Sequence, residues 1–399
     1  MRILCIDVGT GTQDILLFDS SVEIENCVQM VMPSPTQIVA RRARAATSAG
    51  HTILLSGVTM GGGPGAWALE DHIKAGYHVY ATPLAAQTFD DDLERVAAMG
   101  IRIVGQAELE ARWKELGPAR ATHIRMEDVT LSAIDAALGS FNEPAQYDAL
   151  AVAVFDHGAA PPGYSDRRFR FDYISQQMGK WAGEPVERAL AAFAAPSIQI
   201  HPDLTRMLAV RDSVAEAGWG DLPLLLMDTG AAALMGALGD PHVDRASEGN
   251  ALFVNVGNFH TLAFHIVGRR IRALFEHHTG LLDGPKLVRL LQRLACGTLT
   301  NQEVFDDSGH GALTLPAGAS PPQGTQEVSL CMVTGPRRNM LGGLDTPWPI
   351  YMAVPHGDMM LSGCYGLLRA YAAHFPDASE KILPRLHTAK INNSTLANS

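Results

Sequence analysis

The chain is poor in cysteine, in positive charge and in long hydrophobic runs. Its five cysteines are scattered over 399 residues, and none forms a C-x-x-C pair. This spacing argues against an iron–sulfur cluster or a structural zinc site and favours a reducing compartment. The apolar runs are shorter than the roughly 20 residues that cross a bilayer, and the chain does not begin like a secretory signal peptide. We therefore expect a cytoplasmic protein without membrane association.

The small number of basic residues limits the classes of partner. Lys and Arg number 31 against 42 Asp and Glu, which gives a formal net charge of −11. A general nucleic-acid footprint is therefore not expected. Hydrophobic residues make up 47% of the chain and charged residues 18%, and the length of 399 residues predicts two or three globular domains.

Short β-type runs alternate with amphipathic helical stretches along most of the chain. The predicted strands are 52–58, 78–83, 101–105, 149–155 and 222–228, and the predicted helices are 34–49, 89–99, 129–139, 283–295 and 359–374. Alternation of this kind predicts an α/β fold with a largely parallel sheet.

The stretch "ILCIDVGTGTQDILLFD", residues 3–19, joins two apolar strands by a tight turn of Gly and Thr. Such a turn exposes backbone N–H groups and hydroxyls to phosphate oxygens without a Cβ clash. Asp7, at the end of the first strand, could hold a hydrated Mg²⁺ that bridges phosphates. The alternative is a plain hairpin whose aspartate caps the turn.

The same pattern returns once, in "ALFVNVGNFHTLAFHIV" at residues 251–267. A shift of 248 positions carries residue 3 onto residue 251 and aligns Asp7 with Asn255, Gly9 with Gly257 and Thr10 with Asn258. In both copies a third strand (25–32 and 270–277) and then a helix follow. The order β-β-β-α, found twice, predicts two similar domains with a cleft between them.

These segments resemble the actin-like ATPase superfamily, which includes sugar kinases and heat-shock chaperones. The resemblance implies two ribonuclease-H-like domains that clasp ATP and Mg²⁺. It implies phosphate contacts from Gly9, Thr10, Gly11 and Thr12 and from Gly257, Asn258, His260 and Thr261, a metal role for Asp7, and an adenosine turn with Gly335 and Arg337 in "CMVTGPRRN". Asn255, in place of the usual aspartate, and Pro336, in place of a glycine, depart from the pattern and leave the ligand's identity open.

Two further segments resemble sugar-kinase strands that end in catalytic residues. "LMDTGAAALMGALG" (226–239) places Asp228 where these enzymes have the base of phosphoryl transfer, and "VAVFDHG" (152–158) places Asp156 and His157 at the substrate. For Asp228 the alternative is a cap on the helix that begins at Thr229. For Asp156 and His157 the alternative is an ordinary turn.

Other clusters allow two interpretations each. Gly61, Gly62 and Gly63 precede a predicted helix and form either an anion site or a flexible turn. His157, His260, His277, His278 and His356 fall at predicted loop ends and could ligate a transition metal, although spacing alone does not bring them together. Arg167, Arg168 and Arg170 form either a clamp for an anionic substrate or a solvated turn.

The domain boundaries follow from the duplication. We expect a first domain over 1–240 with insertions at about 57–128 and 159–221, a second over 241–390, and a tail at 391–399. "TMGGGP" (59–64), "ATPLAAQTF" (81–89) and "DHG…RFRF" (156–171) also resemble a family labelled "putative pyruvate formate-lyase activating enzyme". A radical activase needs clustered cysteines to hold its cluster, and this chain has none, so we expect no iron–sulfur cofactor.

Three functions remain open at this point. The first is an ATP- and Mg²⁺-dependent enzyme that phosphorylates a small molecule or hydrolyses ATP. The second is a nucleotide-gated activator or binding protein, with a partner protein. The third is a member that uses the cleft for a metal or for another ligand.

Overall fold

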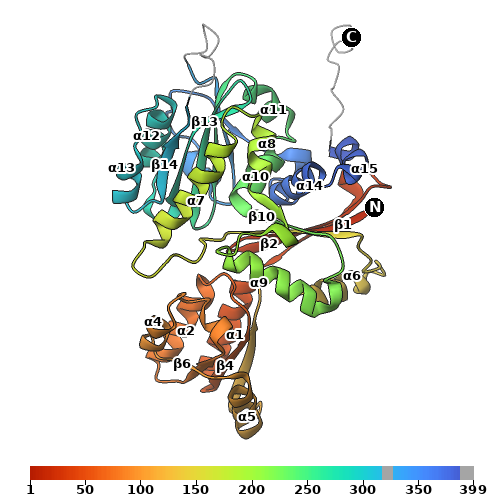
Figure 1. Ribbon diagram of the computed structural model, residues 1–399, viewed down its shortest axis with the longest axis vertical. Helices are drawn as coiled ribbons and strands as arrows, with labels where there is room; N and C mark the ends of the chain where they lie inside the picture. Colours follow the sequence, from red (N-terminus) through yellow and green to blue (C-terminus); the bar gives the residue numbers. More distant parts are fainter. Residues whose placement is uncertain (317–326, 387–399) are drawn as a thin grey trace.

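The two predicted hairpins open two separate six-stranded sheets in the computed structural model, which describes residues 1–316 and 327–386 (Figure 1). The first sheet has the order β3-β2-β1-β8-β10-β9, formed by Val28–Pro33, Thr12–Asp19, Arg2–Val8, Ala149–Val154, Leu224–Asp228 and Ala194–Pro196. The second has the order β14-β13-β12-β11-β15-β16, formed by Gly311–Thr314, Arg270–His278, His260–Val267, Asn250–Val256, Leu330–Thr334 and Ile350–Met352. The predicted tail, 391–399, lies outside the described residues.

Five strands of each sheet share one topology, and the sixth lies at opposite edges, β9 beside β10 and β14 beside β13. In each, three antiparallel strands come first in the chain, and two parallel strands are then added beside the first of them: β8 and β10 beside β1, and β15 and β16 beside β11. The hairpin strands also start 248 residues apart, at Arg2 and Asn250 and at Thr12 and His260. The predicted duplicated α/β fold, with two ribonuclease-H-like halves, is confirmed.

Helices α10 (Thr229–Ala237) and α14 (Ser362–His374) join the two halves. Each helix follows one half and packs toward the other, and together they contribute to a core shared by both sheets. A Cβ at Gly236 would lie 1.7 Å from the carbonyl oxygen of Ser362, and one at Gly366 would lie 1.9 Å from that of Ala232. Small residues therefore set how closely the two helices approach each other.

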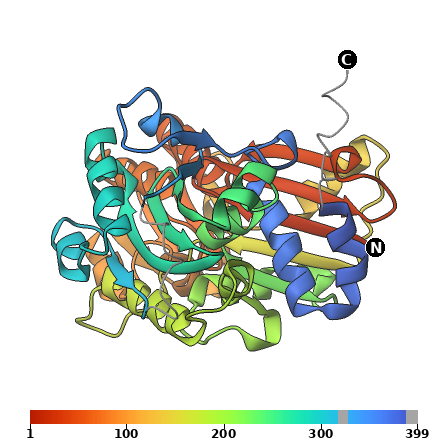
Figure 2. The same ribbon diagram turned by 90° about the horizontal axis from the view of Figure 1, so that it is seen from above.

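The outer faces of both sheets are covered by further helices. Helices α6 (Leu131–Ser140) and α9 (Thr205–Val214) cover the first sheet, and α12 (Gly284–Ala295) and α13 (Asn301–Asp306) cover the second. Helices α7 (Asp166–Lys180), α8 (Val186–Ala191), α11 (Pro241–Ser247) and α15 (Pro376–Leu386) complete the two halves. Seen from above, α14 and α15 in blue lie beside the red strands near the N-terminus (Figure 2). Because β1, β8 and β11 are covered on both faces, their sequences are almost continuously apolar.

A third sheet forms a separate inserted domain, which lies below the rest in Figure 1. Its parallel strands, in the order β6-β5-β4-β7, are Ile101–Ile103, Val79–Ala81, Thr52–Gly57 and Ala121–Met126. Helices α1 (Pro35–Ala49), α2 (Pro64–Lys74), α3 (Pro83–Ala86) and α4 (Leu93–Ala98) share its main core, and α5 (Gln106–Leu116) packs on the other face. Because α1 and β4 belong to this domain, the insertion starts earlier in the chain than residue 57. In the part of the chain that the structure describes, no helix is both long and apolar enough to cross a membrane.

Candidate functional site

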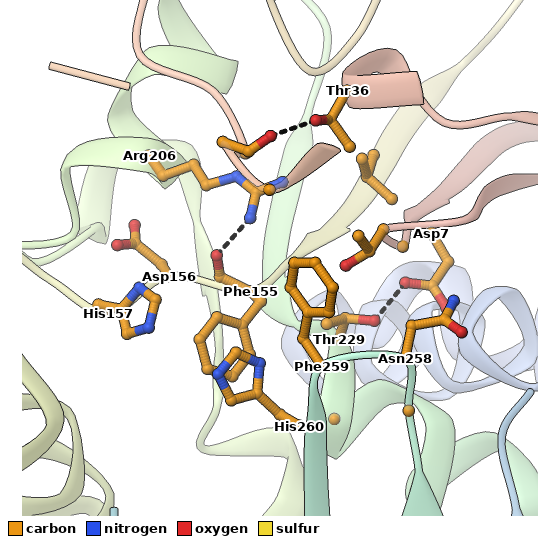
Figure 3. A pocket seen from close by; sticks show the side chains of 18 of the residues that line it. Asp7, Thr36, Phe155, Asp156, His157, Arg206, Thr229, Asn258, Phe259 and His260 are labelled. Carbon is orange, nitrogen blue, oxygen red and sulfur yellow. Dashed lines mark hydrogen bonds between the residues drawn. The ribbon is translucent and has the colours of Figure 1, made fainter. Parts of the chain in front are cut away.

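A cavity of about 460 Å³ lies where the two hairpin turns and the inserted domain meet (Figure 3). The structure brings these predicted site residues to its wall: Asp7, Gly9, Thr10, Thr12, Asp156, His157, Gly257, Asn258, His260 and Gly335. Thr261 is fully buried and bonds to Thr279 instead, and Arg337 is exposed at the surface. The predicted convergence of both turns with Gly335 is therefore present.

The two turns have the same backbone geometry. The N–H of Gly9 donates to the carbonyl of Thr12 over 2.9 Å, and the N–H of Gly257 donates to the carbonyl of His260 over 3.0 Å. The turns also touch each other, because a Cβ at Gly11 would lie 2.8 Å from the amide nitrogen of the Asn258 side chain. Each half of the fold therefore contributes one tight turn to the same wall.

Two carboxylates, Asp7 and Asp14, form an acidic pair beside the first turn. They are paired across the hairpin of β1 and β2 and are only 8% and 7% exposed. The Thr229 hydroxyl donates to Oδ1 of Asp7 over 2.6 Å, whereas Oδ1 of Asp14 is buried without a hydrogen-bond partner among the described residues. Burial raises the pKa of Asp7 to about 7 and that of Asp14 to about 8, and the negative charge of Asp7 adds to the latter.

Four helices direct their N-terminal ends at the cavity. Gly63 precedes α2, Thr205 begins α9, Thr229 begins α10 and Ser362 begins α14, and all four residues line the wall. Some of their first N–H groups are already bonded, those of Gly230 and Ala231 to Asp228 and that of Met207 to Asp156. The partial positive charge of the helix ends still favours an anion. The triglycine 61–63 therefore lies at the cavity, as the anion-site interpretation requires.

The charged side chains of the wall are mostly acidic. Besides Asp7 and Asp14, the carboxylates are those of Asp90, Asp91, Asp156, Asp166 and Glu276. The only arginine or lysine among the described residues that line the cavity is Arg206, which pairs with Asp128 at 2.6 Å and donates to the carbonyl of Phe155. Burial and neighbouring carboxylates raise the pKa of Asp91 to about 6. An anionic ligand would therefore need a cation to accompany it.

Asp228 does not line the cavity, contrary to the prediction from the sequence. Its Oδ1 accepts from the N–H groups of Gly230 and Ala231 at the start of α10, and its Oδ2 accepts from Arg170 over 2.8 Å. Arg170 also bonds twice to Glu276, at 2.9 and 2.8 Å. Asp228 is therefore a helix cap and an ion-pair partner, which was the alternative interpretation.

The arginine cluster likewise has a structural role. Arg170 is 3% exposed and links Asp228 of the first sheet to Glu276 of the second. Arg167 donates to the carbonyl of Phe305 over 3.0 Å, and Arg168 lies over the Phe305 ring. The predicted clamp for an anionic substrate is not formed by these contacts, and Arg170 is not solvated.

Asp156 and His157 have different surroundings although they are adjacent. Both oxygens of Asp156 accept backbone N–H groups, from Gly158 over 2.8 Å and from Met207 over 2.9 Å. His157 opens to solvent through the cavity, but protein atoms surround most of its ring, and this burial lowers its pKa well below the usual value. The backbone therefore holds the Asp156 carboxylate in place, and both Asp156 and His157 line the cavity.

The predicted histidines separate into two groups. His157 and His260 lie together with His310, which sequence analysis missed, and His278 stands beside them. His277 instead contacts the carboxylate of Asp307 at 3.2 Å, and His356 packs against Tyr365. Two of the five predicted histidines therefore belong to a three-histidine group.

Several residues of the cavity wall are not among those predicted from the sequence. Asp14 stands opposite Asp7 once the short turn fixes the hairpin register, so its pairing with Asp7 could have been found. Asp91 and Arg206 lie in the predicted insertions, and nothing in their local sequence pointed to the cavity. His310 directly precedes β14, a strand that was not predicted.

Three of the solved structures to which this chain is similar share little of its sequence. An exopolyphosphatase-like protein is 10% identical over 84% of this chain, with a TM-score of 0.28, and the chain spans 65% of that protein's length. A carbohydrate kinase from Novosphingobium aromaticivorans is 11% identical over 93% of this chain and 91% of its own, with a TM-score of 0.27. A ROK family transcriptional regulator, a homologue of the E. coli MLC protein, is 10% identical over 68% of this chain and 37% of its own, with a TM-score of 0.21.

A family comparison covers most of the chain, whereas a search of curated proteins finds no match. Residues 60–340 match the family described as "Putative pyruvate format-lyase activating enzyme (DUF1786)". The matched range includes most of the inserted domain, the β8 and β10 strand ends and the second hairpin turn. Because the match extends over well more than half of the chain, the protein belongs to this family.

Proposed function

We propose that the cavity binds ATP as its Mg²⁺ complex and that the protein hydrolyses ATP or transfers its phosphoryl group to a small molecule. The observation that carries the proposal is the pair of equivalent turns, at Gly9 and at Gly257, which face one cavity from the two halves. The helix N-termini around it favour phosphate oxygens. A volume of about 460 Å³ falls within the usual range of small-molecule pockets.

The residues at the first turn fit a divalent cation. Asp14 Oδ1 is buried without a partner, and Asp7 stands opposite it with one oxygen bonded to Thr229. A Cβ at position 363 would lie 1.9 Å from Oδ2 of Asp7, so the glycine at the start of α14 leaves this carboxylate its space. Asp7 and Asp14 would hold Mg²⁺, which supplies charge neutralisation for phosphate groups.

The acceptor side of the reaction needs a group that can take a proton. Asp228 is engaged with Arg170 and α10, and Asp156 with two backbone N–H groups. Asp91 also lines the cavity, and its raised pKa of about 6 is close to the working pH of a general base. We assign Asp91 this role in the proposed reaction.

The family description implies a radical activase, and the cysteines do not fit its cluster. All five cysteines lie in the described part of the chain, and no three of them come together in a group able to hold a metal. Burial raises the pKa of Cys331 to about 12, and it also raises the pKa of Cys5 and of Cys364 well above the usual value. These thiols remain protonated, whereas an iron–sulfur cluster binds thiolates.

The test combines phosphate release with thermal stability on the full chain. Mg²⁺–ATP should raise the melting temperature of the wild type, because a ligand that binds only the folded state stabilises it. Asp7→Asn keeps the shape of the side chain but removes its charge, and it should cut phosphate release by about 100-fold. Asp212→Asn, on the exposed side of α9, is the matched control and should leave turnover unchanged.

Phosphate release by the folded variants decides whether the proposal holds. Circular dichroism establishes that both variants are folded before turnover is compared. Turnover that is the same in Asp7→Asn and in the wild type would remove the metal role and the proposed phosphoryl chemistry.

One contact supports a second candidate function, a nucleotide-gated switch. Trp67 of the inserted domain meets Phe259 of the second turn, with ring centroids 5.5 Å apart. A ligand that bound both turns would change the position of the inserted domain over the cavity, because Trp67 joins that domain to the second turn. In that case nucleotide would alter protease protection of the inserted domain, while phosphate release would stay at background in the wild type.

A further inference from the structure

Three histidines from distant parts of the chain meet beside the cavity. His157 follows β8, His260 begins β12 and His310 precedes β14, and one ligand atom of each lies within 4.8 Å of the others. The ring centroids of His260 and His310 are 5.1 Å apart, and those of His157 and His260 are 5.7 Å apart. This spacing brings three imidazole nitrogens toward one point.

His310 is the most unusual member of this histidine group. It is 1% exposed, and neither of its ring nitrogens has a hydrogen-bond partner among the described residues. A buried polar group without a partner typically costs about 1–3 kcal/mol, so such groups call for an explanation. Its Nδ1 lies 3.8 Å from the carboxylate of Glu276, which leaves Nε2 as the nitrogen available to a ligand.

The protonation states suit metal ligation. Burial lowers the pKa of His310 to about 2, and it lowers the pKa of His157 and of His260 well below the usual value. Each imidazole is therefore neutral at pH 7 and keeps a lone pair for a metal ion.

The charge of Arg170, which lies beside the histidine group, is balanced by two carboxylates. Arg170 lies close to the group, with its guanidinium 3.8 Å from the centroid of the Phe155 ring that stacks on His260. Its charge is balanced by Asp228 and Glu276, so this triad carries one net negative charge. Glu276 lies 3.8 Å from Nδ1 of His310, beyond hydrogen-bond distance, so its effect on the ring is that of a nearby negative charge.

We propose that His157, His260 and His310 bind a divalent transition-metal ion of the Zn²⁺ class, with a remaining coordination position open to the cavity. Three neutral imidazoles suit Zn²⁺ and its neighbours, whereas Mg²⁺ prefers oxygen ligands such as Asp7 and Asp14. His157 and His260 both line the cavity, so the open position faces the ligand that the cavity holds. The site does not depend on nucleotide binding and would stand if the proposed function failed.

The experiment measures metal content on the full chain. Every protein carries Cys296→Ser, because Cys296 is an exposed thiol that could bind Zn²⁺ by itself. After removal of metals with a chelator, Zn²⁺ is titrated by calorimetry, and bound zinc is counted by mass spectrometry. Co²⁺ replaces Zn²⁺ in parallel, so that absorption bands in the visible range report direct coordination by the protein.

The wild type should bind one Zn²⁺ per chain. His310→Asn and His157→Asn should each weaken Zn²⁺ binding by about 100-fold or more and abolish the Co²⁺ bands. His157 is exposed, so its variant still decides the question if His310→Asn fails to fold. His356→Asn is the matched control, since His356 is a histidine outside the group whose left-handed backbone, with φ of 50°, asparagine tolerates.

Two results would overturn the proposal. One is the absence of stoichiometric Zn²⁺ binding to the wild type, and the other is Zn²⁺ binding to folded His157→Asn at wild-type affinity. Asp7→Asn should keep the Zn²⁺ site even though it loses Mg²⁺–ATP, so failure here is distinguishable from failure of the proposed function.

Discussion

The two hairpin turns have the same backbone and different chemistry. At the first turn Asp7 and Asp14 face each other, and the equivalent positions at the second turn are Asn255 and Leu262. At the second turn the chain instead places His260, where the first has Thr12. One turn is therefore suited to a hard cation with oxygen ligands, and the other to a metal that binds nitrogen.

This difference separates what the fold requires from what the function requires. Both turns keep the glycine N–H to carbonyl hydrogen bond that closes the hairpin, at 2.9 and 3.0 Å. The side chains around the turns are not constrained by that bond and can diverge. Because the side chains of the two turns have diverged, a duplicated fold can bring two chemically different sites to one cavity.

The largest expected effect is on the free energy of unfolding, through the ion pairs of Arg170 that link the two halves. Arg170→Ala would leave Asp228 and Glu276 buried without their partner, so it should lower the free energy of unfolding by about 3–5 kcal/mol. Denaturant unfolding measures this loss. Arg168→Ala, on the exposed side of the same helix, is the control and should cost less than about 1 kcal/mol. Equal losses in the two variants would contradict the role of Arg170 as a bridge.

The next prediction tests whether the two turns are interchangeable. Asp7→Asn combined with Asn255→Asp moves one carboxylate from the first turn to the second. Because the second turn has Leu262 opposite, without a paired carboxylate, the double variant should remain about 100-fold below the wild type in phosphate release. Recovery of turnover in the double variant would show that the two turns are still equivalent.

A smaller effect concerns the pH dependence of stability. The pKa of Asp14 is raised to about 8, so the stability that its neutral form contributes is fully present below about pH 4 and is lost as pH rises through 8. Asp14→Asn removes this dependence and should stabilise the protein by about 1–3 kcal/mol at pH 8.5, with little change at pH 4. Melting temperatures of both proteins across this range, without divalent cations, measure the difference. A difference that grows as pH falls would contradict the assignment.

The smallest expected effect lies at the edge of the cavity. Trp67 is 55% exposed and touches Phe259 across the boundary between the inserted domain and the second turn. Trp67→Ala should therefore cost less than about 1 kcal/mol in unfolding free energy. If the inserted domain closes on a bound nucleotide, the same variant should weaken nucleotide binding several-fold. A large loss of unfolding free energy in Trp67→Ala without nucleotide would instead show that this contact belongs to the hydrophobic core.

Much of the fold could be predicted from the sequence because its signals are local. The repeated hairpin, the following third strand and the helix each have a pattern within a short stretch, and the positions of β1, β2, β11 and β12 agree with the 248-residue shift. The sequence predicts an insertion here but not a separate parallel sheet, because the start of the inserted domain at α1 directly follows β3 without a break in composition.

The site was predicted less completely because burial and pairing are long-range. Asp228 has the same local sequence whether it acts as a base or as a cap, and only Arg170, from 58 residues earlier, decides between these roles. His310 has no neighbouring motif, and its meeting with His157 and His260 depends on how β14 joins the second sheet. Such contacts come from tertiary packing and leave no pattern in the local sequence.

The most direct test of the nucleotide account is calorimetric titration of ATP into the full chain at pH 7.5, with Mg²⁺ and with a chelator. The wild type should bind ATP with Mg²⁺ and lose about tenfold or more in affinity without it, because the acidic wall repels phosphates that carry no cation. Asp7→Asn should bind weakly under both conditions. Equal wild-type affinity with and without Mg²⁺, or wild-type affinity in Asp7→Asn, would contradict the claim that the first turn holds the metal of a bound nucleotide.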